Sequence, residues 1–320
     1  MTAPRALMAA ALVLALHAGA RADDQGNFLV ERDNVEIAPA DAVKLLAIEV
    51  DNRIGDVTIE GRDGPGVSLA VIKRAPDAAT LERLKVKLVP DPSGVIRVTA
   101  AVVLTGEEAQ PLPTPLARVD IKLTVPRGVH LDVRAWNGKV SVTGVRGGLS
   151  LAANRADFEV TGVEGAVSTA NTRGRQQIVD VKGEVSARNT FGDVVLDRVS
   201  GDSLEARVSE GGVVATHIRS RQVLITTTFG DILFRGELVA GGSYQISSHK
   251  GNVEVLVGGA SFRLDAYSRD GTVDPQVELS DVARPEPGRL LGSFGGPGGR
   301  PAGLELRSIL GDVRLGLVSE

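Results

Sequence analysis

The phrase Asn189-Thr190-Phe191-Gly192-Asp193-Val194-Val195-Leu196 decides the fold, because it recurs through the chain from Trp136 to about Asp274. Its copies include Trp136-Asn137-Gly138-Lys139-Val140-Ser141-Val142, Thr228-Phe229-Gly230-Asp231-Ile232-Leu233-Phe234 and His249-Lys250-Gly251-Asn252-Val253-Glu254-Val255. Each copy places a turn at glycine, then alternates apolar residues, and returns after about 18 to 21 residues. The equivalent turn positions are Gly138, Ala156, Gly174, Gly192, Gly212, Gly230, Gly251, Gly271 and, after a longer gap, Gly311. A period of this length indicates a repeat architecture.

Each repeat contains two short strands. Apolar residues stand two and four places after the glycine, as at Val194 and Leu196, and a period of two is that of a strand with one buried face. A second apolar pair follows further on, as at Val185 and Ala187 in the repeat of Gly174. Two strands and two turns in about 18 residues leave no room for a helix.

We predict an all-β fold, a parallel β-solenoid (β-helix) of about nine coils. In such a stack each residue lies about 4.8 Å from its equivalent in the next coil, so like residues form columns. Charges after the glycine alternate in sign, which agrees with stacking because opposite charges attract across neighbouring strands; they are Lys139, Asp157, Arg175 and Asp193. An antiparallel barrel or sandwich is the alternative, but hairpins do not require both strands to recur in phase.

The sequence predicts three regions. Residues 1–22 read as a signal peptide, residues 23–117 as a β-rich N-terminal cap, and residues 118–320 as the solenoid with a Pro/Gly-rich insertion at 284–303. The cap holds one isolated copy of the phrase, Gly55-Asp56-Val57, and a helical turn or two is compatible with Asp77 to Leu84. Residues 105–117, with alternate prolines, are expected to form a loop. The 284–303 insertion is expected to be irregular and to have no core.

The first 22 residues carry the features of a Sec-type signal peptide. Arg5 precedes an apolar run from Ala6 to Leu16, and Ala20-Arg21-Ala22 is a small-x-small cleavage site. The run is too short to remain as a transmembrane segment in the mature chain. We therefore expect an exported protein, periplasmic, at the cell surface or secreted. The chain has no Cys, which excludes both disulfides and the lipid attachment of a bacterial lipoprotein.

The composition bears on possible partners. The net charge is −4, and removal of Arg5 and Arg21 with the signal would take it to about −6. A mildly acidic chain without a basic tract is a poor nucleic-acid binder, so nucleic acid is not expected as a partner.

The strand Leu123-Thr124-Val125-Pro126-Arg127-Gly128, followed by serial Gly-Asp-Val or Gly-Asp-Ile phrases, resembles a bacterial family. Its members are exported β-strand-repeat proteins catalogued as putative adhesins, a domain of unknown function, in which a strand ending in Val-Pro-x-Gly precedes such phrases. The matching phrases begin at Gly55, Gly192, Gly230 and Gly311. The resemblance extends from about Phe28 to Leu317 and implies a β-solenoid and an adhesin-like role. It supplies no catalytic residues.

Four residue patterns bear on chemistry. The histidines are His17, His130, His217 and His249, and they do not share a column, whereas a zinc site needs three or four convergent ligands. The Gly-Asp turns offer one carboxylate per coil, which is too few for a calcium cage. The best cluster for a polysaccharide-acting enzyme is Asp193, Asp197, Asp202 and Asp231 with Arg198. Arginines recur near the turns, at Arg134, Arg146, Arg155, Arg173, Arg175 and Arg188, where they could face anionic envelope polymers.

We therefore expect no catalytic residues, no cofactor site and no metal site, and a protein that is not an enzyme. The expected function is that of an adhesin-like binding or scaffold protein of the cell envelope, with an envelope or extracellular polymer or protein as its partner. The alternatives are a periplasmic component that senses envelope stress or the cell wall and a polysaccharide-acting enzyme.

Overall fold

The structure is a computed structural model that describes residues 12–13, 21–22, 28–37, 45–102, 117–296 and 299–318. The chain divides into two compact units, residues 1–153 and 154–320. The expected signal peptide lies outside the described residues, except for β1 (Leu12–Val13) and β2 (Arg21–Ala22), and so does most of the expected loop at 105–117. Within the described residues no helix is long and apolar enough to cross a bilayer.

Unit 1 is β-rich. Its further elements are β3 (Leu29–Ile37), β4 (Ala47–Ile54), β5 (Val57–Arg62), β6 (Val67–Ala75), α1 (Ala78–Arg83), β7 (Leu84–Asp91), β8 (Val95–Val102), β9 (Arg118–Pro126), β10 (His130–Thr143) and the start of β11 (Leu149–Glu164). Strands β3, β6, β9 and β5 form one ladder that continues to the second half of β10. Strands β7, β8 and β4 form another that continues to its first half.

The isolated phrase in unit 1, Gly55-Asp56-Val57, pairs with its neighbour in the same way as the repeats do. Val57 pairs in parallel with Val140, and the backbone N–H of Gly55 donates to the Asn137 carbonyl at 3.2 Å. Strands β9 and β10, which the sequence assigned to the solenoid region, thus pair with strands of the expected cap. The helical turn expected after Asp77 is α1, whose first turn is capped by the Asp77 side chain accepting from the Thr80 N–H at 2.7 Å.

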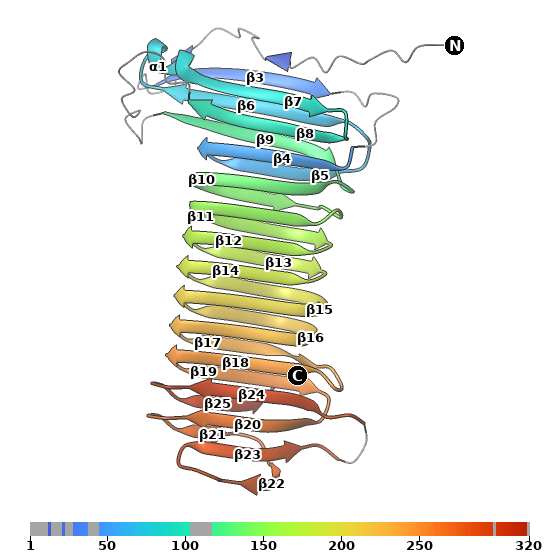
Figure 1. Cartoon of the computed structure of the whole chain (residues 1–320), viewed down its shortest axis with the longest axis vertical. Helices are drawn as coiled ribbons and strands as arrows, with labels where there is room; N and C mark the ends of the chain where they lie inside the picture. Colours follow the sequence, from blue (N-terminus) through green and yellow to red (C-terminus); the bar gives the residue numbers. More distant parts are fainter. Residues whose placement is uncertain are drawn as a thin grey trace, which may run out of the picture. The chain divides into compact units, whose positions relative to one another are not determined.

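Unit 2 is a stack of parallel strands (Figure 1). Its strands after β11 are β12 (Val167–Arg173), β13 (Gln176–Lys182), β14 (Val185–Phe191), β15 (Val194–Glu210), β16 (Val213–Phe229), β17 (Ile232–Leu238), β18 (Ser243–Lys250), β19 (Val253–Gly259), β20 (Phe262–Ser268), β21 (Val273–Pro275), β22 (Ser280–Ala283), β23 (Arg289–Phe294), β24 (Ala302–Ser308) and β25 (Val313–Leu317). The predicted parallel β-solenoid is confirmed.

Each coil contributes one strand to each of two sheets. Sheet A contains the end of β11, then β13, the first halves of β15 and β16, and β17, β19, β25 and β21. Sheet B contains β12, β14, the second halves of β15 and β16, and β18, β24, β20 and β23. The core lies between the sheets, where Phe234 of sheet A and Tyr244 of sheet B meet edge to face at 6.2 Å.

The last coil in sequence is not the last in space. Val313 of β25 pairs with Val253 of β19 on one side and with Val273 of β21 on the other. Strand β24 lies in the same way between β18 and β20. Strands β24 and β25 accordingly lie within the stack in Figure 1, with β20 to β23 beyond them. The period in sequence does not specify this order, because it does not determine which neighbour a coil pairs with.

Part of the 284–303 insertion is ordered into the sheet, which corrects the expectation of an irregular segment without a core. Strand β23 pairs antiparallel with β20, and Leu290 is only 1% exposed. Phe294 stacks on Phe262, with ring centroids 5.1 Å apart. The prolines and all the glycines but Gly292 lie outside this strand, whose apolar side chains are those of Leu290, Leu291 and Phe294.

Candidate interaction surface

The turn glycines are required by close stacking. Gly192 has φ +119°, and a Cβ there would lie 2.4 Å from the carbonyl oxygen of Gly174 in the preceding coil. The same holds at Gly230, where a Cβ would lie 2.1 Å from the Gly211 oxygen. The member of this column in the intervening coil is therefore Gly211 and not Gly212 as the sequence predicted, since two adjacent glycines leave the register ambiguous.

The aspartate after each glycine joins one coil to the next. Asp157 accepts from the backbone N–H of Arg175 at 2.8 Å, and Asp231 accepts from that of Asn252 at 2.6 Å. Asp193 does the same with Gly212, and Asp56 of unit 1 with Lys139. These carboxylates hold the turns in register, which is the structural role of the Gly-Asp phrase.

A second ladder of side chains, absent from the sequence predictions, lies three residues before each turn. Asn189 donates to the Gly174 carbonyl at 2.8 Å, and Ser248 donates to the Gly230 carbonyl at 2.9 Å. The other members are Asn171, Thr227, Ser268 and Ser308. All of them are buried. The signal in the sequence is an Asn, Ser or Thr three places before glycine, which recurs in all these repeats.

The carboxylates proposed for enzyme chemistry do not gather. Asp193 and Asp231 belong to the turn ladder, whereas Asp197 lies four residues further along β15, next to Arg198. Asp202 lies between the two halves of β15. Of the histidines, His217 contacts Asp197, while His130 of unit 1 and His249 lie in other columns. Within the described residues no three His, Asp or Glu side chains are placed to hold a metal ion.

Asp197 takes part in a surface cluster with strained backbone. Asp180, Arg198 and His217 lie in successive coils, and all three have positive φ, between 52° and 55°. Arg198 Nε lies 2.5 Å from Asp180 Oδ1 and also donates to Asp197, while His217 Nδ1 lies 2.7 Å from Asp197 Oδ1. The hydrogen bond from Arg198 lowers the pKa of Asp180. Partial burial raises the pKa of Asp197, but hydrogen bonds from His217 and Thr216 outweigh it and lower that pKa. The cluster is thus charged and internally paired.

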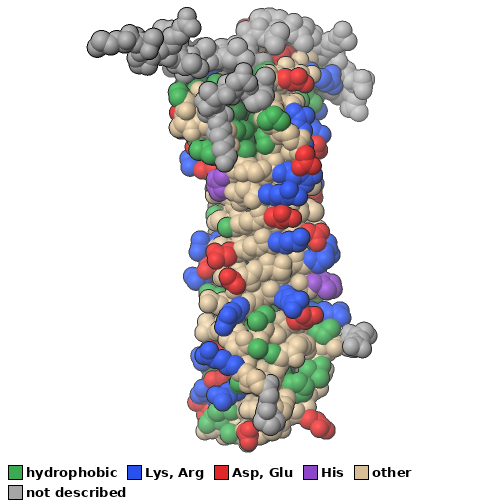
Figure 2. All heavy atoms as spheres, turned by 90° about the vertical axis from the view of Figure 1, so that its right-hand side faces the viewer, with side chains coloured by type: hydrophobic (Ala, Val, Ile, Leu, Met, Phe, Trp, Pro, Cys, Tyr) green, Lys and Arg blue, Asp and Glu red, His purple; other side chains and the backbone are tan. Residues whose placement is uncertain are grey.

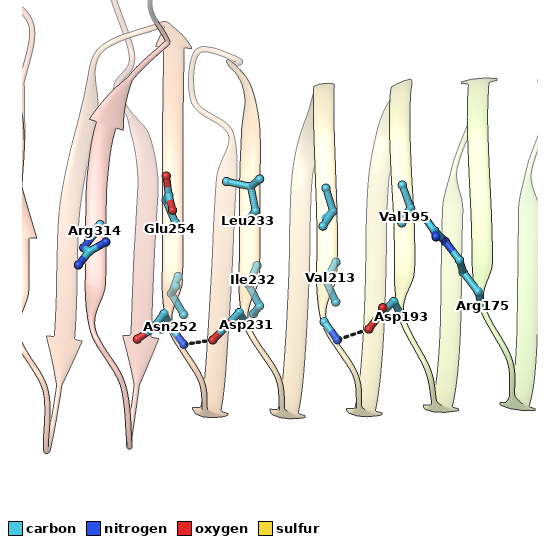
Figure 3. A pocket seen from close by; sticks show the side chains of 13 residues that line it. Arg175, Asp193, Val195, Val213, Asp231, Ile232, Leu233, Asn252, Glu254 and Arg314 are labelled. Atoms are coloured by element: carbon cyan, nitrogen blue, oxygen red, sulfur yellow. Dashed lines mark hydrogen bonds between the residues drawn. The ribbon is translucent and has the colours of Figure 1, made fainter.

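The outer face of sheet A carries an aliphatic row. The outward side chains three places after the turn position are aligned by strand register, and we call them the outer row: Glu159, Gln177, Val195, Val214, Leu233, Glu254 and Arg314. Val214 is 37% exposed. Around its centre lies a shallow hollow of about 370 Å³, bounded at the turns by Asp193, Asp231 and Asn252 (Figure 3). Figure 3 also shows Arg175 reaching across towards Val195.

The outer face of sheet B carries charged side chains that pair within the chain. On the outer face of sheet B, Glu205 is bridged by Arg188 at 2.8 Å and by Arg207 at 3.0 Å. Figure 2 shows basic and acidic side chains intermixed on the edge that it faces. Among the arginines near the turns, Arg173 stacks over the ring of Phe191, with its guanidinium carbon 5.4 Å from the ring centroid. Exposed apolar side chains also occur at Phe229, Val282, Leu310 and Leu317. Val195, Val214 and Leu233 differ from these because they lie in register on adjacent strands of sheet A.

Comparison with known proteins gives one family match. The sequence profile described as Toastrack DUF4097 matches residues 103–290. A search of curated proteins found no match. Similar solved structures include a "putative cell adhesion protein" from Clostridium sporogenes, at 8% identity and TM-score 0.26, with 90% of this chain and 100% of that chain covered. Another is a "putative adhesin" from Parabacteroides distasonis, at 11% identity and TM-score 0.31, with 90% and 97% covered.

Proposed function

This chain belongs to the Toastrack DUF4097 family, and we propose that it is a non-catalytic binding or scaffold protein of the cell envelope that acts through the outer face of sheet A. Membership agrees with the resemblance to a bacterial family of unknown function drawn from its Val-Pro-x-Gly strand and Gly-Asp phrases. An adhesin-like role is part of the proposal.

The single observation that carries the proposal is the aliphatic centre of the outer row. Val195, Val214 and Leu233 lie side by side on adjacent strands of a regular sheet, at a hollow edged by charged and polar groups. Apolar side chains that gather on an outer face favour contact with a partner over contact with water. A stack of coils holds these side chains at fixed spacing, so the surface is preorganised.

The carboxylates support a binding role over an enzymatic one. A general acid or base needs a carboxyl group aimed at substrate. Here Asp193 and Asp231 accept backbone N–H bonds across the turns, and Asp197 accepts from Arg198 and Thr216. The oxygens of these carboxylates therefore accept hydrogen bonds from the protein itself.

The envelope location rests on the signal-peptide features of residues 1–22, and protease shaving of intact cells tests it. Residues 281–288 are exposed, with Val282 54% exposed, so this segment of unit 2 offers a cleavage site to a protease of broad specificity such as proteinase K. Trypsin is unsuitable there, because proline follows both Arg284 and Arg300. Loss of the protein from intact cells supports a surface-facing binding protein. Survival until the outer envelope is permeabilised favours the periplasmic scaffold or sensing role. Retention in the cytoplasm contradicts the envelope proposal.

A further inference from the structure

We propose that the outer face of sheet A binds a second copy of this chain, across a two-fold axis that runs parallel to β16 and passes through Val214. The inference rests on the proposed function in one respect, that this face is a binding surface, and it adds a second copy of the chain to the partners that the face binds. Two sheets that pack face to face lie about 10 Å apart with their strands nearly aligned. A two-fold axis along a strand keeps strand direction and reverses the order of the coils.

The outer row is complementary to itself when its order is reversed. Val214 then meets its own copy, and Val195 meets Leu233 of the other copy. At the ends of the row Glu159 meets Arg314, and Gln177, an amide donor, meets the carboxylate of Glu254. Because the axis repeats each contact, four polar pairs would flank an aliphatic centre.

The next outward positions along the same strands match under the same operation. Val179 meets Leu256, and Asp197 meets Arg235, whose charge has the opposite sign. Thr216 meets its own copy. Reversal therefore places apolar groups against apolar groups and acid against base in both rows.

The other possible two-fold axis, along the stack of coils, is unfavourable. It would set every coil against the same coil of the second copy, so Glu159 would face Glu159 and Arg314 would face Arg314. Like charges placed opposite each other oppose association. Within the outer row, the charge pattern thus selects the axis parallel to the strands.

Two features limit the contact to the first half of each strand. At the turn edge, Asp193 and Asp231 would approach each other's copies, but each directs Oδ1 along the edge to the next backbone N–H. Beyond the strained column of His217, Arg219 would meet its own copy, and it lies 3.7 Å from Glu237 in its own chain. We therefore place the boundary of the interface at that column.

The size of this contact predicts weak association. Six coil spacings of about 4.8 Å give a length of roughly 29 Å, and four residues along a strand give a width of about 13 Å. The area is then well below the roughly 800 Å² per partner of a stable interface, so the dimer is expected only at high concentration.

Sedimentation velocity of the full chain over a range from about 1 µM to about 1 mM, at low ionic strength, tests the proposal. We expect a concentration-dependent dimer that Val214→Lys abolishes, because two lysines would face each other on the axis. The matched control is Thr226→Lys, on the outer face of sheet B of the same strand, which should dimerise normally. Circular dichroism of each variant checks that it is folded.

A charge swap tests the register and does not depend on Val214→Lys folding. Glu159→Arg and Arg314→Glu should each weaken the dimer by about tenfold or more, and the double variant should restore it. Within one chain the two residues are about 29 Å apart, so rescue must act between copies. A chain that stays monomeric at all concentrations, or a double variant as weak as the single ones, overturns the proposal. If a monomeric chain still binds envelope material through this face, only the dimer inference fails and the proposed function stands.

Discussion

The Oδ1 atom of Asp193 accepts a hydrogen bond at 2.8 Å from the backbone N–H of Gly212, the residue at the same turn position in the next coil. Asp231 makes the equivalent bond to Asn252, as Figure 3 shows. The Gly-Asp phrase is thus a device for stacking coils, and its carboxylates are structural.

Removal of this carboxylate should have a small effect on stability. We expect Asp193→Ala to lower the free energy of unfolding by about 1 kcal/mol, the usual contribution of one hydrogen bond. Asp193→Asn keeps an acceptor oxygen at the same place and should remain close to the parent chain. Urea denaturation of the three proteins measures the difference. A loss much larger than this for Asp193→Asn would contradict the hydrogen-bond account.

Substitution of a turn glycine should be far more damaging. Gly192→Ala combines a positive φ with a Cβ only 2.4 Å from the Gly174 carbonyl oxygen, so neighbouring coils must separate. We expect a loss of at least about 3 kcal/mol, given the cost of strained backbone and overpacking. The matched control is Gly258→Ala, where a Cβ meets no atom within 4 Å. Equal melting temperatures for the two variants would show that close stacking does not require glycine.

Residues near the C-terminus should be as important as those in the middle of unit 2. Leu306 of β24 is fully buried between β18 and β20, so Leu306→Ala should cost about 2–5 kcal/mol. Leu317, in β25, is 45% exposed, and Leu317→Ala is the control that should cost much less. Thermal unfolding compares them. A terminal coil that merely caps the stack would tolerate both substitutions.

The pairing of β23 with β20 should weaken in acid. Arg289 donates to both carboxylate oxygens of Asp265, at 3.0 and 2.8 Å, and these bonds lower the pKa of Asp265 below its ordinary value of 3.8. A lowered pKa means that the folded state holds fewer protons, so the contribution is present above about pH 3.8 and is lost as the pH falls through the folded-state value.

Asp265→Asn removes the titrating group and serves as the comparison. Hydrogen exchange of β23 amides, measured at several values from about pH 5 downwards, should show the parent chain converging on the variant at low pH. If the protection of the β23 amides in the parent chain rises on acidification, the predicted direction of the pH dependence is contradicted.

A buried ion pair in unit 1 should be sensitive to loss of one partner. Lys73 is 7% exposed and lies 2.6 Å from Glu31 and 3.3 Å from Asp33, which is 5% exposed. Lys73→Met leaves the buried carboxylate of Asp33 and the partly exposed one of Glu31 without their cation, at an expected cost of about 3–5 kcal/mol. Equilibrium denaturation measures this, and the paired change Lys73→Met with Asp33→Leu should recover part of the loss. No recovery would mean that the cost comes from packing and not from charge.

Much of the fold follows from the sequence because its cause is local. The turn glycines, the alternation of Val194 and Leu196 and the second strand from Val185 each impose a geometry on a few residues, and the solenoid is the fold that satisfies them all. The Ser, Thr and Asn ladder is equally local, since each member lies three residues before a turn glycine. These residue types are also common on the solvent-facing side of strands, so their recurrence alone does not mark them as buried.

The remaining features depend on long-range choices that no local pattern encodes. The insertion of β25 between β19 and β21 is a choice of pairing partner, and the repeat period does not specify it. The aliphatic row on sheet A is visible only after the register aligns Val195, Val214 and Leu233. Surface function therefore needed the structure, whereas the fold class did not.

The most direct test of the central claim is the retention of the purified chain on isolated envelope fractions, compared with that of Val214→Lys and Thr226→Lys. The account predicts that the parent chain and Thr226→Lys are retained equally, that Val214→Lys is lost, and that no envelope polymer is degraded. Equal retention of both lysine variants, or measurable turnover of a polymer, would contradict a non-catalytic binding surface on sheet A.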